Sequence, residues 1–425
     1  MKIFIFFFFG VLIAIRTSLK LSLKRKSLSN EGYVEYSPMT LTICLGTPPQ
    51  CFDLAYDTGS YFIWVPDESL ETFYQKYFNP DNSSTFLEEL VEVYSNETDD
   101  KIIGYEAIDT LSLNPMNPHN RYFFNFVIAQ SFYYSPTKAD GNLGLARNYT
   151  HPIESVGDSS NIKRFSFMEM LNSLNIINRN IFYHRYTSHD AGELFFGEEL
   201  VLKSNENLFT CKCSYKNELP QRFNDFWNCQ INKMILENIE TEFEDSYAIF
   251  STAEEYIIAP FRIGVKIMER YKTFFPDNCV ISSQEDYQME CKEANFSSLP
   301  SLTFEFGDYQ MIIPPENLFI KSKDIYIFAV KASNTNNFWI FGDPALKIQP
   351  MMFDQDNNVV GFISTTQTPK SYSMTVLLWF IVAVLVGVFL FFTISAIMRY
   401  KTRKNLEESL TKSQMAIPIN EIQEK

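Results

Sequence analysis

The chain has 425 residues, 46% hydrophobic and 20% charged, which is enough to build one large or two medium domains with a buried core. Its 51 acidic and 36 basic residues give a net charge of −15, which argues against a nucleic-acid partner, because phosphate binding needs clustered cations. The four histidines are scattered without metal-ligand spacing, so we expect no metal site and no cofactor.

The chain begins with a short apolar run, residues 3–15, which lies between Lys2 and Arg16. This run is too short to cross a bilayer comfortably and is typical of the hydrophobic region of a signal peptide. We therefore expect a signal peptide over residues 1–18, with a short membrane anchor as the alternative.

A longer apolar segment lies near the other end of the chain. Residues 374–398 carry no charge and, at about 1.5 Å rise per residue, can span a ~30 Å hydrocarbon core. Basic residues follow directly, so the tail over residues 399–425 is expected in the cytoplasm. The pattern predicts a single-pass type I membrane protein of the secretory or endocytic route or the cell surface, with a stalk over residues 367–373.

The region between these segments reads mostly as short strands separated by turn sequences. Aromatic and β-branched residues predict strands at residues 40–45, 51–56, 122–128 and 324–330, and residues 166–174 carry the clearest helical pattern. Four sequons on the expected lumenal side are candidate glycosylation sites: Asn82, Asn96, Asn148 and Asn295.

One sequence motif occurs twice in the chain, and the prediction of function depends on its two copies. In the first copy, residues 52–66, an apolar strand runs into Asp57-Thr-Gly-Ser and continues to a tryptophan. This copy resembles the first active-site segment of pepsin-like aspartic peptidases. Residues 78–86, 140–146, 338–343 and 353–362 resemble further segments of that family, in the same order.

The resemblance covers roughly residues 33–365 and implies an all-β, bilobal, pepsin-like fold. The N-terminal lobe is expected over residues 33–199 and the C-terminal lobe over residues 200–366. Residues 19–32 resemble the beginning of the family's propeptide, of which only a stub remains. Tyr94 resembles the flap tyrosine, although the surrounding flap has no glycine.

Aspartic peptidases use two carboxylates about 3 Å apart that share one proton, one as general base and the other as acid. The second copy, residues 247–260, aligns with the family pattern without a gap. Ser251 stands at the position of the second catalytic aspartate, Ala253 replaces a glycine, and Glu254 replaces a threonine. Because serine has no charge to share and no useful acidity, the dyad is predicted to be incomplete.

The resemblance assigns roles to the remaining residues of the two copies. Thr58 and Thr252 match the threonines that brace the two active-site loops against each other. The residues expected to contact a bound peptide are Thr58, Gly59, Ser60, Tyr94, Thr252 and Ala253.

Three functions follow from this pattern. The first is a pseudoprotease whose cleft binds a peptide or protein partner without cleaving it. The second is a weakly active aspartic-type endopeptidase, in which the longer Glu254 side chain supplies the missing carboxylate beside Asp57. The third is an adhesion or sorting glycoprotein in which the cleft has no role. Proteolytic activity is therefore expected to be absent or weak.

The seven cysteines are expected to pair in an oxidising compartment. Cys44 and Cys51 flank a Gly-Thr-Pro-Pro turn and can pair across that hairpin. Cys291 lies where the family has a bridging cysteine, and Cys279 is its expected substitute partner. Cys229 is expected to pair with Cys213 or with Cys211, which leaves one thiol free.

Overall fold

The structure is a computed structural model, and two compact units divide it: residues 1–369 and residues 370–425. The statements below concern the residues that it describes: 18–25, 38–60, 62–71, 76–97, 100–113, 121–132, 139–147, 166–197, 202–214, 225–282, 287–292, 296–322, 324–335, 337–366, 386–388 and 390–406.

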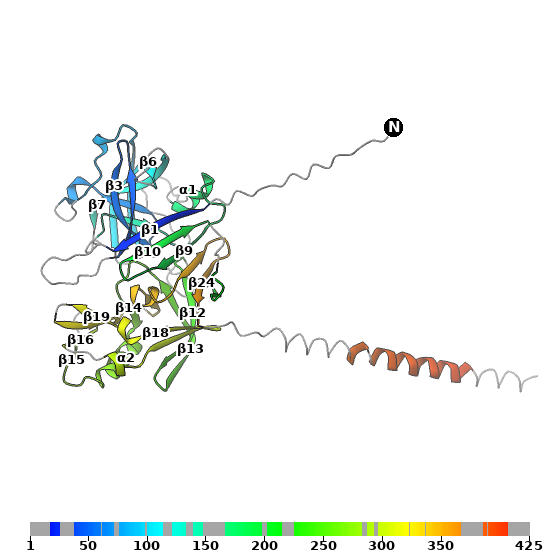
Figure 1. Cartoon of the computed structure of the whole chain (residues 1–425). Coiled ribbons are helices and arrows are strands. Elements are labelled where there is room, and N and C mark those ends of the chain that lie inside the picture. Colours follow the sequence, from blue (N-terminus) through cyan, green and yellow to red (C-terminus); the bar gives the residue numbers. More distant parts are fainter. Residues whose placement is uncertain are drawn as a thin grey trace, which may run out of the picture. The chain divides into compact units, whose positions relative to one another are not determined.

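Strands from the first half of the chain form the N-terminal lobe, which is blue and cyan in Figure 1. Apolar side chains fill these strands; in β2, for example, six of the seven residues are buried. The strands of this lobe are β2 (Met39–Leu45), β3 (Gln50–Asp57), β4 (Ile63–Pro66), β5 (Leu87–Glu97), β6 (Asp100–Ser112), β7 (Arg121–Phe132) and β8 (Asn142–Gly144).

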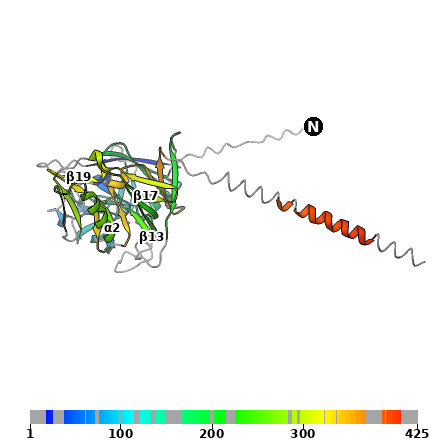
Figure 2. The same cartoon turned by 90° about the horizontal axis from the view of Figure 1, so that it is seen from below.

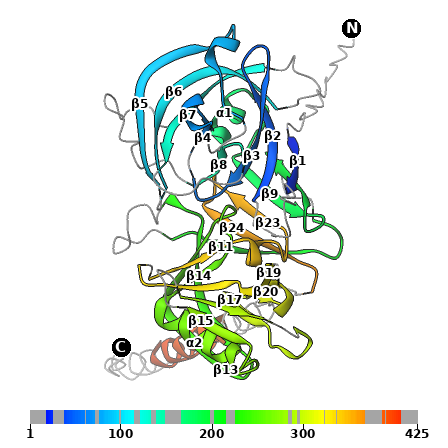
Figure 3. The same cartoon turned by 90° about the vertical axis from the view of Figure 1, so that its left-hand side faces the viewer.

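Two further sheets form the C-terminal lobe, shown in green and yellow in Figure 3. Its outer strands alternate buried and exposed residues, as in β18, because one face packs on the core and the other faces solvent. The strands of these sheets are β12 (Asn228–Leu236), β13 (Ile239–Phe250), β14 (Ile257–Pro260), β15 (Cys279–Ser282), β16 (Gln288–Cys291), β17 (Leu302–Phe306), β18 (Tyr309–Ile313), β19 (Phe319–Ser322), β20 (Ile325–Phe328), β21 (Val330–Ser333) and β22 (Trp339–Phe341).

A third group of strands continues the N-terminal sheet, and its members come from the beginning, the middle and the end of the first unit. These strands are β1 (Leu19–Arg25), β9 (Ile181–Tyr186), β10 (Ala191–Phe196), β11 (Asn207–Lys212), β23 (Met351–Asp354) and β24 (Val359–Ser364). The complete sheet has 13 strands in the order β11-β24-β23-β9-β10-β1-β2-β3-β8-β4-β7-β6-β5. Aromatic stacking helps to hold it together, since the ring centroids of Phe182 and Phe353 lie 4.8 Å apart. The fold is therefore mostly β and bilobal, as predicted.

The α-helices in the described part of the first unit are α1 (Phe167–Ser173), α2 (Phe261–Lys272) and α3 (Asp343–Leu346). The helix predicted over residues 166–174 is confirmed as α1, and the Ser166 side chain caps it by accepting a hydrogen bond from the Glu169 N–H. The helix α2 contacts β14, β15 and β21, and Figure 2 shows it from below.

One strand prediction needs correction. Residues 324–330 were expected to form a single strand, but β20 ends at Phe328 and β21 begins at Val330. Ala329 separates them because its N–H donates to the Leu318 carbonyl while its own carbonyl accepts from the Ile257 N–H. Its backbone therefore bonds to segments outside both strands.

In the second unit, residues 386–388 and 390–406 are helical. Among the residues that the structure describes, no helix combines the length and the apolar character needed to cross a membrane. The expected span lies partly outside the described residues, at 374–385 and 389, as do residues 1–17 of the expected signal peptide and the expected stalk.

Candidate active site

The two copies of the sequence motif end in matching turns. β3 ends at Asp57 and pairs in parallel with β8, whereas β13 ends at Phe250 and pairs in parallel with β22. Each strand is followed by a turn that contains a threonine, Thr58 in the first copy and Thr252 in the second. Asp57 and Ser251 therefore occupy corresponding positions, one residue before these threonines.

The two threonines connect the turns through four reciprocal hydrogen bonds. The Thr58 hydroxyl donates to the Phe250 carbonyl at 2.7 Å, and the Thr252 hydroxyl donates to the Tyr56 carbonyl at 2.7 Å. Each hydroxyl also accepts from the backbone N–H of the other threonine at 3.1 Å. Both side chains are buried, so these bonds fix the two turns against each other, as the resemblance implied.

The side chains of Asp57 and Ser251 both lie beside Gly59. A Cβ atom placed on Gly59 would lie 3.2 Å from Asp57 Oδ1 and 3.0 Å from Ser251 Oγ. The Gly59 N–H also donates to Asp57 Oδ1 at 2.7 Å. A carboxylate and a neutral hydroxyl thus stand side by side where the enzymes of this design need two carboxylates.

Asn142 is a site residue that the sequence analysis missed. Its amide donates to Asp57 Oδ2 at 3.2 Å and to Ser60 Oγ at 2.8 Å, and the side chain is only 4% exposed. Ile340 holds the matching position in the second lobe, two residues before the glycine that ends the segment. That difference between two otherwise similar apolar segments is the sequence signal that identifies it.

Glu254 lies on the second turn, and its carboxylate accepts a hydrogen bond from the Tyr256 N–H at 3.2 Å. Burial raises the pKa of the Glu254 carboxyl to about 7, although the Tyr256 N–H and the positive charge of Lys331 act in the opposite direction. The Lys331 ammonium lies 3.8 Å from the centroid of the Tyr256 ring. Glu254 is therefore a carboxyl group that gains and loses its proton near neutral pH.

The first residue of α3 and the glycine before it hold this second turn in place. The Asp343 N–H donates to the Glu254 carbonyl at 2.9 Å, and the Gly342 N–H donates to the Tyr256 carbonyl at 3.1 Å. A Cβ atom on Gly342 would lie 2.3 Å from the Glu254 carbonyl oxygen, so only glycine allows this close approach.

The remaining predicted residues are only partly described. Tyr94 lies in β5 opposite Ile103, but its side chain and that of Asn96 are outside the described part of the structure. Ala253 lies on the second turn and is partly exposed. Asn82 is exposed at the end of a short 3-10 helix, Pro80–Asn82, whereas Asn148 and Asn295 fall outside the described residues.

Two predicted disulfides are confirmed and one is corrected. Cys44 pairs with Cys51, and Cys279 pairs with Cys291. Cys229 was expected to pair with Cys213 or Cys211; it pairs with Cys211, whose Cα atom lies 5.9 Å from that of Cys229, within bonding reach. Cys213 follows the end of β11 as a buried free thiol, and burial raises its pKa.

The described residues contain no group of three or more His, Cys, Asp or Glu side chains that could hold a metal ion. The polar chemistry at the turns comes instead from one carboxylate, one hydroxyl, one amide and the nearby Glu254. These groups suit hydrogen bonding to a polar backbone, since they offer both donors and acceptors.

Comparison with known proteins identifies the class to which this fold and site belong. Residues 39–365 match the family model described as eukaryotic aspartyl protease, so the chain belongs to that family. Pepsin II-1 of Oryctolagus cuniculus is 26% identical over 356 residues, which cover 80% of this chain and 83% of that protein. Cathepsin D of Homo sapiens is 24% identical over 345 residues, which cover 75% of this chain and 79% of that protein.

Proposed function

We propose that this chain is a non-catalytic member of the aspartyl protease family that binds a peptide or protein partner. The observation that carries the proposal is the Ser251 hydroxyl, which lies beside Gly59 together with the Asp57 carboxylate. A dyad needs one group that accepts a proton while the other donates one, and the shared proton requires two acids of similar strength. A serine hydroxyl is far too weak an acid to share a proton with Asp57.

The preserved framework supports a binding role. The four threonine hydrogen bonds, the Gly59 N–H on Asp57 and the close packing at Gly342 all keep the two turns in fixed positions. The matching family model is described as eukaryotic aspartyl protease, and a peptide-like ligand is the natural occupant of a site built on the same framework. The function retained is thus recognition without cleavage.

A weak endopeptidase is the second candidate, and Glu254 favours it. A carboxyl group with a pKa near 7 can donate or accept a proton in the range where Asp57 would need a partner. Its hydrogen bond to the Tyr256 N–H must then break before it can turn toward Asp57. Even a small misplacement in such a site costs on the order of 100-fold in rate, so weak activity at most is expected.

The proposal includes a location. Residues 374–398 form an uncharged segment followed by Arg399, Lys401, Arg403 and Lys404, which supports a type I membrane protein of the secretory or endocytic route. In that arrangement the site faces the lumen or the cell exterior.

The test is to compare cleavage and binding in the same preparations. The full chain in detergent is incubated with a mixed peptide library between pH 4 and 7, with Asp57→Asn as the control for contaminants and Glu254→Gln as a second variant. Pepstatin, a peptide-like inhibitor, serves as the binding probe in calorimetry. We expect no cleavage above the Asp57→Asn background together with measurable pepstatin binding that Asp57→Asn weakens.

A restored dyad makes the test sharper. The variant Ser251→Asp, alone and with Ala253→Gly, should cleave the library at least about 100-fold faster than the natural chain, since acid–base catalysis supplies such factors. Cleavage by the natural chain that is lost in both Asp57→Asn and Glu254→Gln would instead establish the endopeptidase. Absence of both cleavage and probe binding would direct attention to adhesion or sorting by another surface.

A further inference from the structure

The N-terminal strand β1 occupies an interior position in the 13-stranded sheet. It pairs with β10 along its length, from Leu19 opposite Phe196 to Lys24 opposite Ala191. On its other side Lys24 and Arg25 pair with Thr40 and Met39 of β2. Loss of β1 would therefore leave two neighbouring strands with unpaired edges.

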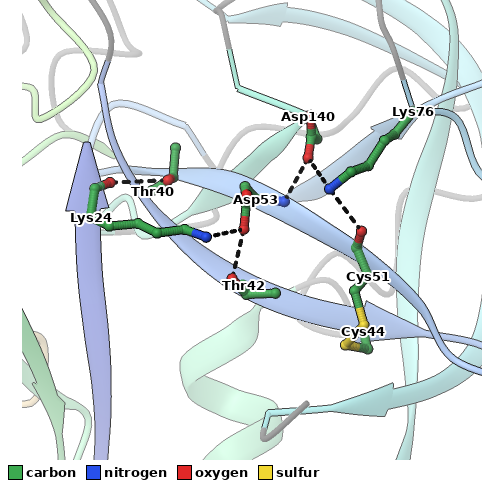
Figure 4. A network of polar contacts seen from close by, with 8 residues as sticks. All are labelled: Lys24, Thr40, Thr42, Cys44, Cys51, Asp53, Lys76 and Asp140. Atoms are coloured by element: carbon green, nitrogen blue, oxygen red, sulfur yellow. Dashed lines mark hydrogen bonds and ion pairs between the residues drawn. A yellow bond between two sulfur atoms is a disulfide. The ribbon is translucent and has the colours of Figure 1, made fainter. Parts of the chain in front are cut away.

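The last two residues of β1 are basic, and each has its own acidic partner. Lys24 forms an ion pair with Asp53 at 3.0 Å, and the Thr42 hydroxyl donates to the same carboxylate oxygen at 2.6 Å (Figure 4). Asp53 lies on β3, the strand that ends at Asp57. Because the Lys24 side chain is 57% exposed, this contact contributes little to stability.

Arg25 makes the stronger connection, and it reaches the C-terminal lobe. Its guanidinium lies 2.7 Å from Asp343 Oδ1, with side-chain exposures of only 9% and 7%. It also donates to the His189 carbonyl at 3.3 Å, and its own backbone N–H donates to the Asp190 carbonyl. Lys347 is the second cation near Asp343, at 3.8 Å. A buried carboxylate that loses one of these cations leaves its charge poorly compensated.

Asp343 connects this ion pair to the candidate active site. While its carboxylate binds Arg25, its backbone N–H donates to the Glu254 carbonyl at 2.9 Å. The preceding Gly342 donates to the Tyr256 carbonyl in the same segment. A single residue therefore joins the N-terminal strand to the turn that carries Ser251.

We infer that β1 is a permanent clamp of the folded protein, retained in the mature chain, and that Arg25 is a positioning residue for the Ser251–Glu254 turn. Lys24 and Arg25 are both held in the sheet by backbone pairing and by acidic partners. This inference concerns the scaffold and does not depend on whether the site cleaves or only binds.

The test uses the full chain purified from secreting cells and three single variants: Arg25→Met, Asp343→Asn and Lys20→Met. Lys20 is the matched control, because it lies on the same strand and pairs with Glu193 at the surface, 53% exposed. Arg25→Met and Asp343→Asn should each lower the melting temperature by roughly 5 °C, and Lys20→Met by less than about 1 °C. The double variant Arg25→Met/Asp343→Asn should recover much of that loss in melting temperature, because it removes both buried charges.

Hydrogen exchange separates positioning from general destabilisation. The amides of Gly342 and Asp343 should exchange faster in Arg25→Met and in Asp343→Asn than in the natural chain. Their exchange rates should be unchanged in Lys20→Met, and the β6–β7 hairpin should keep its protection in all variants. If Arg25→Met does not fold, Arg25→Lys retains the charge and permits the same comparison. Denaturing mass spectrometry should find residues 19–25 within the mature polypeptide. A folded mature protein that lacks them, or single-variant effects that simply add in the double variant, would overturn the inference.

Discussion

His184 makes the stability of this protein sensitive to acid. It lies in β9 with no exposed surface, surrounded by the rings of Tyr56, Tyr186 and Phe353 at centroid distances of 6.0, 5.1 and 5.9 Å. Burial lowers the pKa of its imidazole from 6.5 to about 4, although the carboxylate of Asp343 and a backbone contact at Leu346 oppose this shift. The folded protein therefore holds His184 neutral where an unfolded chain would protonate it.

The sign and size of the effect follow from linkage. Because the folded pKa is lower than the unfolded pKa, the stabilisation is complete above pH 6.5 and is lost as the pH falls toward 4. Each pKa unit corresponds to about 1.36 kcal/mol, so the fall from pH 7 to 4 removes about 3 kcal/mol of unfolding free energy. The variant His184→Phe keeps an aromatic ring among the same neighbours but binds no proton.

The assay is urea unfolding of the natural chain and of His184→Phe at pH 7, 5.5 and 4. The drop in unfolding free energy between pH 7 and 4 should be about 3 kcal/mol smaller in the variant. His189→Phe, at an exposed histidine, is the control and should follow the natural chain. Parallel pH profiles for the natural chain and His184→Phe would show that the His184 imidazole is not the source of the acid sensitivity.

Three further changes have defined outcomes. Thr252→Val removes two buried hydrogen bonds between the lobes, so urea unfolding should show a loss of about 2–4 kcal/mol, whereas an unchanged midpoint would contradict that role. At pH 8 Glu254→Gln should be more stable than the natural chain by up to about 3 kcal/mol, because burial raises the Glu254 pKa from 4.5 to about 7. The stabilisation from the protonated Glu254 is complete below pH 4.5 and is lost as the pH rises through 7. A constant difference between pH 4 and 8 would exclude this. Asn142→Leu removes a hydrogen-bond donor to Asp57 and should weaken pepstatin binding, measured by calorimetry, about tenfold. Pepstatin affinity equal to that of the natural chain would contradict this role of Asn142.

Much of the fold and half of the site could be predicted because the signals are local. Asp57 and Ser251 each lie in a continuous segment with its own pattern, and Cys44 and Cys51 flank one turn. The confirmed helix α1 likewise carries its capping residue, Ser166, next to its first turn. Such features need no knowledge of distant parts of the chain.

The contacts that sequence reasoning missed join residues far apart in the chain. Arg25 and Asp343 are separated by 318 positions, and nothing in either segment identifies the other as its partner. The choice between Cys211 and Cys213 depended on where β11 ends, a matter of one or two residues. Ala329 divided an apparently continuous strand because its backbone bonds elsewhere. Each outcome is decided by tertiary pairing rather than by local preference.

The order of strands in the large sheet has a consequence for how the protein is made. β9 lies about halfway along the first unit, yet its neighbour β23 lies near the end of the unit, with Phe182 opposite Phe353. During synthesis the backbone edge of β9 that pairs with β23 stays unpaired, and the apolar side chains of β9 remain exposed until β23 has left the ribosome. Contacts between residues this distant along the chain slow folding and prolong the exposure of aggregation-prone hydrophobic surface. Newly made chains should therefore depend on chaperones until the last two strands arrive and close the sheet.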